Sequence, residues 1–255
     1  MKKERGVVAV QNAIEKALNI ILLVISLFFL CVGVYALVDH RLVIKDAEIP
    51  DDFKQSAIAD RQYPDIKKLQ ETNKEIVAWL TIDNTPVDYP ITKSSDNVKY
   101  LAKNYKSEYS LAGNPFVDYR NDFLKDDYTV VYGHRMNQKK MFGSLIEYGD
   151  ASYMQSHLTG SITTTEGTRK LEILLYSIEN IKKTKVYDLV EMRNNNNVEL
   201  LKSLSKNATT VNGKYSRDDL KKAEVGQWDL LLLSTCDKDS QHYRDILLLK
   251  IGDEI

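Results

Sequence analysis

Two side chains that lie close together in the sequence could perform nucleophilic chemistry: the thiol of Cys236 and the guanidinium of Arg244. One apolar run, residues 230–233, stops shortly before the cysteine, and a second, residues 246–249, begins shortly after the arginine. Short apolar runs bounded by polar residues predict buried strands. If these strands are neighbours, the cation faces the thiol, favours its thiolate and can bind a developing oxyanion. This stretch alone leaves a buried core cysteine beside a surface arginine as an equal alternative.

The cysteine count favours the catalytic interpretation. The chain has two cysteines, and Cys31 falls within an uncharged apolar stretch, residues 17–38, that we expect to lie in a membrane. The rest of the chain then holds the single thiol of Cys236 and no internal disulfide. A lone cysteine outside the membrane marks a candidate reactive thiol.

A cysteine nucleophile usually works with a histidine that donates and accepts protons. The chain has four histidines, at positions 40, 134, 157 and 242. His134 ranks first, because it directly follows Gly133 at the end of an apolar strand, where an imidazole can be aimed into a cleft. His242 ranks second, because it is close to Cys236 in the sequence but lies in a polar segment.

Several other chemistries lack their motifs. No metal or other cofactor is expected, because the chain has no CxxC, no HExxH and no spaced histidine pair. A GxSxG serine motif and a glycine-rich phosphate loop are missing as well. The 35 basic and 36 acidic residues give a net charge of −1, which offers no reason to expect a nucleic-acid partner.

The apolar stretch at residues 17–38 predicts a transmembrane anchor. As a helix it would reach roughly 33 Å, enough to cross a bilayer core of about 30 Å, and it is longer than the apolar core of a cleaved signal peptide. Basic residues flank it mainly on the N-terminal side, so residues 1–16 should stay in the cytoplasm. Residues 39–75 are expected to form a stalk with short helices at 52–59 and 64–75. Residues 76–255 should form the domain outside the cell membrane.

Short strands separated by turn residues dominate residues 76–255. We expect eight strands, at residues 76–82, 87–91, 114–119, 128–133, 161–165, 170–178, 230–233 and 246–249. This pattern predicts a closed barrel or a sandwich. The long connection at residues 179–227 should hold one helix, at residues 198–206. It is either a substrate-facing wall or a solvated excursion.

The motifs around these residues resemble a known family. The letters Ser-Thr-Cys ending at Cys236, an arginine at the start of the next strand and the letters Tyr-Gly-His ending at His134 together resemble a sortase, a cysteine transpeptidase of Gram-positive cell surfaces. Residues 87–90, 96–97 with 100–101, 116–121 and 132–145 are similar to the class B branch of that family. The resemblance covers about residues 76–251 and departs from the family pattern at Leu232, where the family often has threonine.

The resemblance implies a mainly β fold, an eight-stranded sortase β-barrel with peripheral helices, preceded by the transmembrane helix. It implies that Cys236 attacks the carbonyl of a threonine in a C-terminal sorting signal, of the type Asn/Ser-Pro-x-Thr-Asn/Gly. His134 would then protonate the leaving amine, and Arg244 would stabilise the oxyanion. The implied partners are secreted proteins that carry such a signal, a peptidoglycan precursor or cross-bridge amine, and the lipid bilayer.

Substrate-binding positions of the family match five residues here: Asn97, Tyr100, Leu101, Ser234 and Thr235. For Tyr100 and Leu101, ordinary packing is an equal alternative. Two alternatives to the transpeptidase also stay open. A hydrolase would resolve the same thioester with water, and a non-catalytic surface β-barrel binding protein would keep its cysteine for structure.

Overall fold

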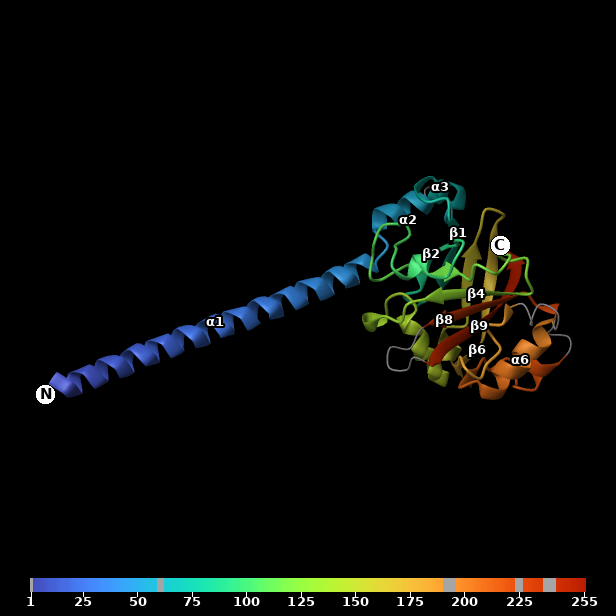
Figure 1. The fold of residues 1–255 in the computed structure, drawn as a ribbon. Helices are drawn as coiled ribbons and strands as arrows, with labels where there is room; N and C mark the ends of the chain where they lie inside the picture. Colours follow the sequence, from blue (N-terminus) through green and yellow to red (C-terminus); the bar gives the residue numbers. More distant parts are fainter. Residues whose placement is uncertain (1, 59–61, 190–195, 223–226, 236–241) are drawn as a thin grey trace. The chain divides into compact units, whose positions relative to one another are not determined.

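A computed structural model describes residues 2–58, 62–189, 196–222, 227–235 and 242–255 (Figure 1). The chain divides into two compact units, Met1–Lys45 and Asp46–Ile255. Its helices are α1 (Lys2–Asp46), α2 (Asp51–Ile58), α3 (Ile66–Thr72), α4 (Ala151–Ser156) and α6 (Asn196–Asn207), with 3-10 turns η1 (Lys99–Leu101), η2 (Asn137–Lys139), η3 (Gly143–Gly149) and η4 (Asp219–Lys221). Its strands are β1 (Ile76–Ile82), β2 (Asp88–Thr92), β3 (Phe116–Val117), β4 (Tyr128–Gly133), β5 (Thr159–Thr163), β6 (Thr168–Asn180), β7 (Thr210–Val211), β8 (Leu230–Thr235) and β9 (Tyr243–Glu254).

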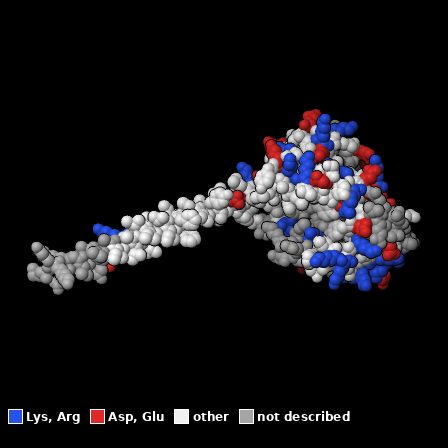
Figure 2. All heavy atoms as spheres, viewed as in Figure 1, with Lys and Arg blue, Asp and Glu red and all other residues white. Residues whose placement is uncertain are grey.

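The first unit is the helix α1, which contains the predicted membrane span and extends beyond it at both ends. By length and composition it is the one helix in the described ranges that could cross a membrane. Large apolar side chains such as Leu23 and Phe29 are exposed along it. The middle of the helix carries no charge, whereas acidic and basic side chains are interspersed over the second unit (Figure 2).

The second unit is a closed β-barrel. Eight strands follow one another in the order β5-β1-β2-β3-β4-β8-β9-β6, and β6 pairs again with β5 to close the circle. The two-residue strand β7 adds to β6 outside this circle. The predicted closed eight-stranded barrel is therefore confirmed, and the sandwich is excluded.

Strand boundaries follow the apolar pattern closely in some places and loosely in others. β1 and β4 begin and end where the sequence predicts, whereas β5 begins two residues earlier than expected. β3 is limited to Phe116–Val117, although the residues on either side still bond to the neighbouring strands. The side-chain amide of Asn114 donates to the carbonyl of Pro90 in β2, and the backbone amide of Asp118 donates to the carbonyl of Val130 in β4. The helix predicted from Pro64 begins at Ile66, with Asp65 as its N-cap through bonds to the next amides.

The uninterrupted apolar run of β8 is explained by burial on both of its faces. Leu231 and Leu233 belong to the main core inside the barrel. Leu230 and Leu232 belong to a second core, which also contains the apolar face of α6. The described part of the long connection is thus packed against the barrel and is not a solvated excursion.

Candidate active site

Three neighbouring strands bring the predicted catalytic positions to one end of the sheet. β4 and β8 are parallel, with Tyr132 opposite Ser234 and Gly133 opposite Thr235. His134 and Cys236 are the residues that follow these two strands in the sequence. Cys236 lies outside the described residues, so the structure provides no geometry for its thiol. The order of the strands carries the inference that the two side chains share one site.

The backbone of His134 is fixed by close packing behind it. The amide of Phe142 donates a hydrogen bond of 3.0 Å to the carbonyl of His134. The buried ring of Phe142 lies directly over Gly133, where an added Cβ would come within 2.6 Å of the ring. A glycine at this position therefore lets the loop fold back and hold the histidine at the strand end.

Arg244 enters the same end of the sheet from β9. This strand is antiparallel to β8, with Ser234 opposite Ile246, so the two C-terminal strands are neighbours, the condition on which the pairing of cation and thiol depended. Arg244 lies two residues before Ile246, is half-buried and donates from Nη1 to the carbonyl of Tyr243 at 2.8 Å. Its cross-strand neighbour on β6 is Glu179, a buried carboxylate that accepts a 2.6 Å bond from Ser177.

The connection before β7 covers the end of β8. The hydroxyl of Tyr187 lies 2.8 Å from that of Ser234, which is 1% exposed. The ring of Tyr187 also stacks on Tyr132, with 6.1 Å between centroids. Among the described residues, Tyr187 thus forms a wall beside Ser234 that the sequence did not single out.

An ion pair supports the same wall from β3. Arg120 bonds to both carboxylate oxygens of Asp118, and the hydroxyl of Tyr132 donates to Asp118 at 2.9 Å. Burial opposes ionisation of Asp118, but these hydrogen bonds outweigh it and lower its pKa. Burial together with the nearby carboxylate raises the pKa of Tyr132, which stays a neutral donor. In the sequence, the only sign of this ion pair is that an acidic and a basic residue, Asp118 and Arg120, lie two positions apart just after a strand.

The positions matched to substrate binding differ in accessibility. Leu101 is 39% exposed, and Asn97 is half-buried with its side-chain oxygen accepting from the amide of Tyr119. Tyr100 is 1% exposed, which favours packing over direct contact for this side chain. Ser234 and Thr235 are buried as well. A ligand would therefore reach Leu101 and Asn97 before the other three.

The remaining described histidines have other surroundings, and His40 lies in α1. His157 stacks on Tyr153 with 3.9 Å between centroids and bonds through Nδ1 to the carbonyl of the same residue. His242 is exposed just before β9, and its carbonyl accepts from the amide of Ile181. His134 remains the first candidate for the proton-transferring residue, and His242 the second.

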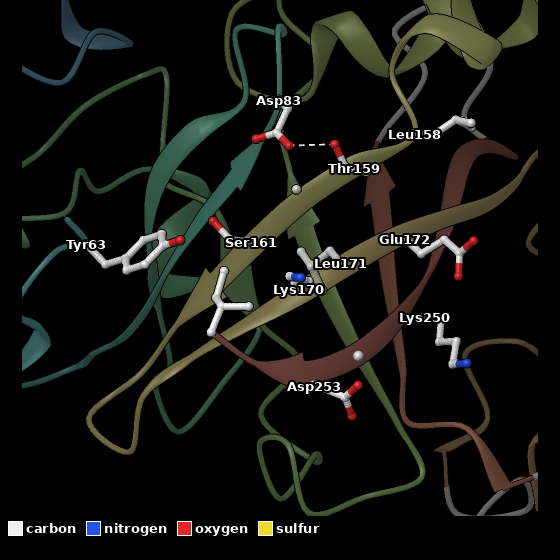
Figure 3. A pocket seen from close by; sticks show the side chains of 13 residues that line it. Tyr63, Asp83, Leu158, Thr159, Ser161, Lys170, Leu171, Glu172, Lys250 and Asp253 are labelled. Atoms are coloured by element: carbon white, nitrogen blue, oxygen red, sulfur yellow. Dashed lines mark hydrogen bonds between the residues drawn. The ribbon is translucent and has the colours of Figure 1, made fainter.

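A cavity of about 710 Å³ lies elsewhere on the barrel, over β5, β6 and β9 (Figure 3). Its lining includes Lys170 and Glu172, which alternate with the buried Leu171 and therefore face outward. On β6, Glu172 of the cavity pairs with Lys250, whereas Glu179 pairs with Arg244 of the candidate site. Seven residues of β6 separate Glu172 from Glu179, so the cavity and the candidate site are about 23 Å apart along this strand. None of the described residues that line this cavity belongs to the candidate active site.

The chain resembles several named proteins, one of them along almost its whole length. No family model matches it. It is 29% identical over 250 residues to sortase B of Listeria monocytogenes, which is 94% of this chain and 97% of that protein. A solved structure of sortase B from the same species superimposes with a TM-score of 0.59 at 32% identity, over 71% of this chain and 97% of that one. A class B sortase of Streptococcus pyogenes involved in pilus biogenesis gives a TM-score of 0.64 at 26% identity, over 73% and 97%.

The closed barrel, its strand order and these likenesses define a sortase-type transpeptidase. The chain belongs to the class B sortases.

Proposed function

We propose that this sortase cleaves a C-terminal sorting signal of the type Asn/Ser-Pro-x-Thr-Asn/Gly after its threonine and transfers the protein to a peptidoglycan amine. The observation that supports it is the parallel pairing of β4 with β8, which ends at Gly133 and Thr235, directly before His134 and Cys236. Arg244 on the adjacent β9 supplies the third group at this end of the sheet.

The chemical steps follow from these three groups. The thiolate of Cys236 attacks the threonine carbonyl carbon, and Arg244 stabilises the oxyanion. The imidazolium of His134 gives its proton to the leaving amine nitrogen as the C–N bond breaks, leaving a thioester. An acceptor amine then attacks the thioester, loses a proton to His134, and the C–S bond breaks to restore the thiolate.

The cation has a definite task in this scheme. In water a thiol is a weaker acid than an imidazolium by about two pKa units, so a thiolate–imidazolium pair is disfavoured roughly hundredfold. A guanidinium close to the sulfur favours the thiolate and reduces that disadvantage. Arg244 therefore serves both the nucleophile and the oxyanion.

We further propose that residues 17–38 span the cell membrane, with residues 1–16 in the cytoplasm and the catalytic domain, residues 76–255, outside. The length of α1 and its charge-free middle support the span. The basic residues on its N-terminal flank support the orientation. Leu101 and Asn97 are proposed to contact the signal peptide directly, whereas Ser234 and Thr235 are buried and Ser234 bonds to Tyr187.

One experiment tests the central step. The full chain in detergent is incubated with a peptide that carries the motif, with and without an acceptor amine, and its mass is measured. We expect an acyl adduct on Cys236 and, with the amine, a transfer product. Cys236→Ala should form neither, and an adduct trapped on that variant contradicts the assignment. Comparison of His134→Ala with His242→Ala decides between the two histidines, and release by water alone would indicate a hydrolase.

A further inference from the structure

The imidazole of His134 has a partner that the steps above do not use. Its Nε2 lies 2.7 Å from the carbonyl oxygen of Leu101. A carbonyl oxygen only accepts hydrogen bonds, so Nε2 carries the proton in this contact. The neutral ring then has its lone pair on Nδ1. It follows that Nδ1 is the nitrogen that gains and loses a proton, while Nε2–H holds the ring in place in both protonation states.

The hydrogen bond between His134 and the Leu101 carbonyl requires a glycine at position 113, next to the imidazole. An added Cβ at Gly113 would come within 2.9 Å of Cδ2 of His134 and within 2.6 Å of the carbonyl oxygen of Tyr100. Gly113 also has φ +62, a backbone conformation that other residues adopt at a cost. The glycine thus allows the imidazole to approach the Leu101 carbonyl.

The turn η1, which carries that carbonyl, is anchored by the side chain before it. The buried hydroxyl of Tyr100 donates to Oε2 of Glu75 at 2.6 Å and accepts from Nδ2 of Asn73 at 2.8 Å. Lys99 donates to the same Glu75 oxygen at 2.5 Å. The η1 turn is therefore tied to the junction between α3 and β1 through a bonded cluster.

The protonation states of Glu75 and Tyr100 strengthen the hydrogen bond between them. Partial burial opposes ionisation of Glu75, but the bonds from Lys99 and Tyr100 outweigh it and lower the pKa of the carboxyl. Burial and the bond to Glu75 raise the pKa of Tyr100. The pair is accordingly a phenol donating to a carboxylate, the stronger form of such a bond.

We propose that Tyr100 and Glu75 are positioning residues for His134: they fix the turn whose Leu101 carbonyl selects the Nε2–H tautomer and leaves Nδ1 for proton transfer. The inference rests on the proposed role of His134 in catalysis. It assigns to Tyr100 an action through the histidine, which its burial allows, instead of contact with the substrate.

The test uses Tyr100→Phe, which removes the hydroxyl and keeps the ring. Its matched control is Tyr105→Phe, a change in a buried tyrosine of the same region whose hydroxyl bonds neither Glu75 nor Asn73. The full chain in detergent is labelled with nitrogen-15 in its histidines, and the His134 signals are assigned by their loss in His134→Ala. Nitrogen shifts of the neutral ring report the tautomer without any turnover.

We expect the wild type to hold the Nε2–H tautomer, and Tyr100→Phe to populate both tautomers. Its kcat should fall about tenfold with little change in KM, which is less than the 10²–10⁴-fold that general acid–base catalysis contributes. The control should change neither quantity. If Tyr100→Phe does not fold, Glu75→Gln replaces it with the same expectation.

An Nδ1–H tautomer in the wild type overturns the inference. So does a variant that folds and keeps either the wild-type tautomer or the wild-type kcat. Failure of the proposed function would give a different result: no thioester would form on Cys236, while the nitrogen shifts would still report the tautomer of His134.

Discussion

Replacing Gly133 by alanine should displace His134, because the added methyl group clashes with the ring of Phe142. The new methyl group would lie 2.6–2.9 Å from three atoms of the Phe142 ring, closer than real Cβ atoms approach. Phe142 is completely buried, so its ring has no free space into which it can turn. The strain passes to the backbone, where the amide of Phe142 holds the carbonyl of His134.

The magnitude follows from two opposing effects. Overpacking a core by a methyl group costs about 1–3 kcal/mol, and replacing glycine removes about 0.4–1 kcal/mol of unfolded-state entropy cost. The net change ranges from about zero to a loss of about 2.6 kcal/mol, or up to about 10 °C in Tm for a unit of this size. A shift of the imidazole by about 1 Å would reduce turnover up to roughly hundredfold even where the protein is folded.

Gly252→Ala is the matched control, because Gly252 also lies in a strand but an added Cβ would be 3.6 Å from its nearest neighbour. Thermal unfolding and turnover of the motif peptide are measured for both variants well below their Tm. The control should gain about 0.4–1 kcal/mol, because it has the entropy effect without the clash, and its turnover should be unchanged. Wild-type stability and turnover in Gly133→Ala would refute the proposed role of the Phe142 contact.

Three further changes address the rest of the site. Arg244→Ala should lower kcat strongly while thermal unfolding is nearly unchanged, and retention of most activity would remove its assigned role. Asp118 has a lowered pKa, so its stabilising effect is present above its unfolded pKa of about 3.9 and is lost as pH falls through the folded value. Asp118→Asn should therefore cost about 1–3 kcal/mol at pH 7 and flatten the acid side of the stability curve, whereas parallel curves from denaturant unfolding at several pH values would contradict this. Tyr187→Phe and Ser234→Ala should each cost about 1 kcal/mol and should not add in a double-mutant cycle, since both remove one hydrogen bond; additive losses would show that the bond is unimportant.

The strands that could be predicted are those whose own sequence of apolar and turn residues determines where the buried strand begins and ends. β1 and β4 were predicted to the residue, because each is an apolar run with a turn signal at its end. Two short apolar runs predict β8 and β9 as strands, and the structure pairs them as neighbours. β3 is shorter than predicted, although the amide of Asp118 still donates to Val130 and its carboxylate accepts from Tyr132, both in the neighbouring strand β4.

The residues of the candidate site also fall into those that the local sequence predicts and those that it does not. His134 and Arg244 could be selected from their places at strand ends. The wall formed by Tyr187 could not, because its contact with Ser234 joins residues 47 apart in the sequence through the fold of the connection. The anchoring of Tyr100 by Glu75 joins segments 25 apart, and no local pattern announces it.

The parallel pairing of β4 with β8 has a consequence for how the enzyme becomes active. The two strands are about 100 residues apart in the chain, and everything between them must fold or be looped out before they meet. Contacts this distant in sequence are the slow ones in folding. His134 therefore reaches the strand that leads to Cys236 only when the barrel closes. With the proposed site, enzymatic turnover is a late reporter of folding, because an incompletely folded chain has not yet brought these two strand ends together.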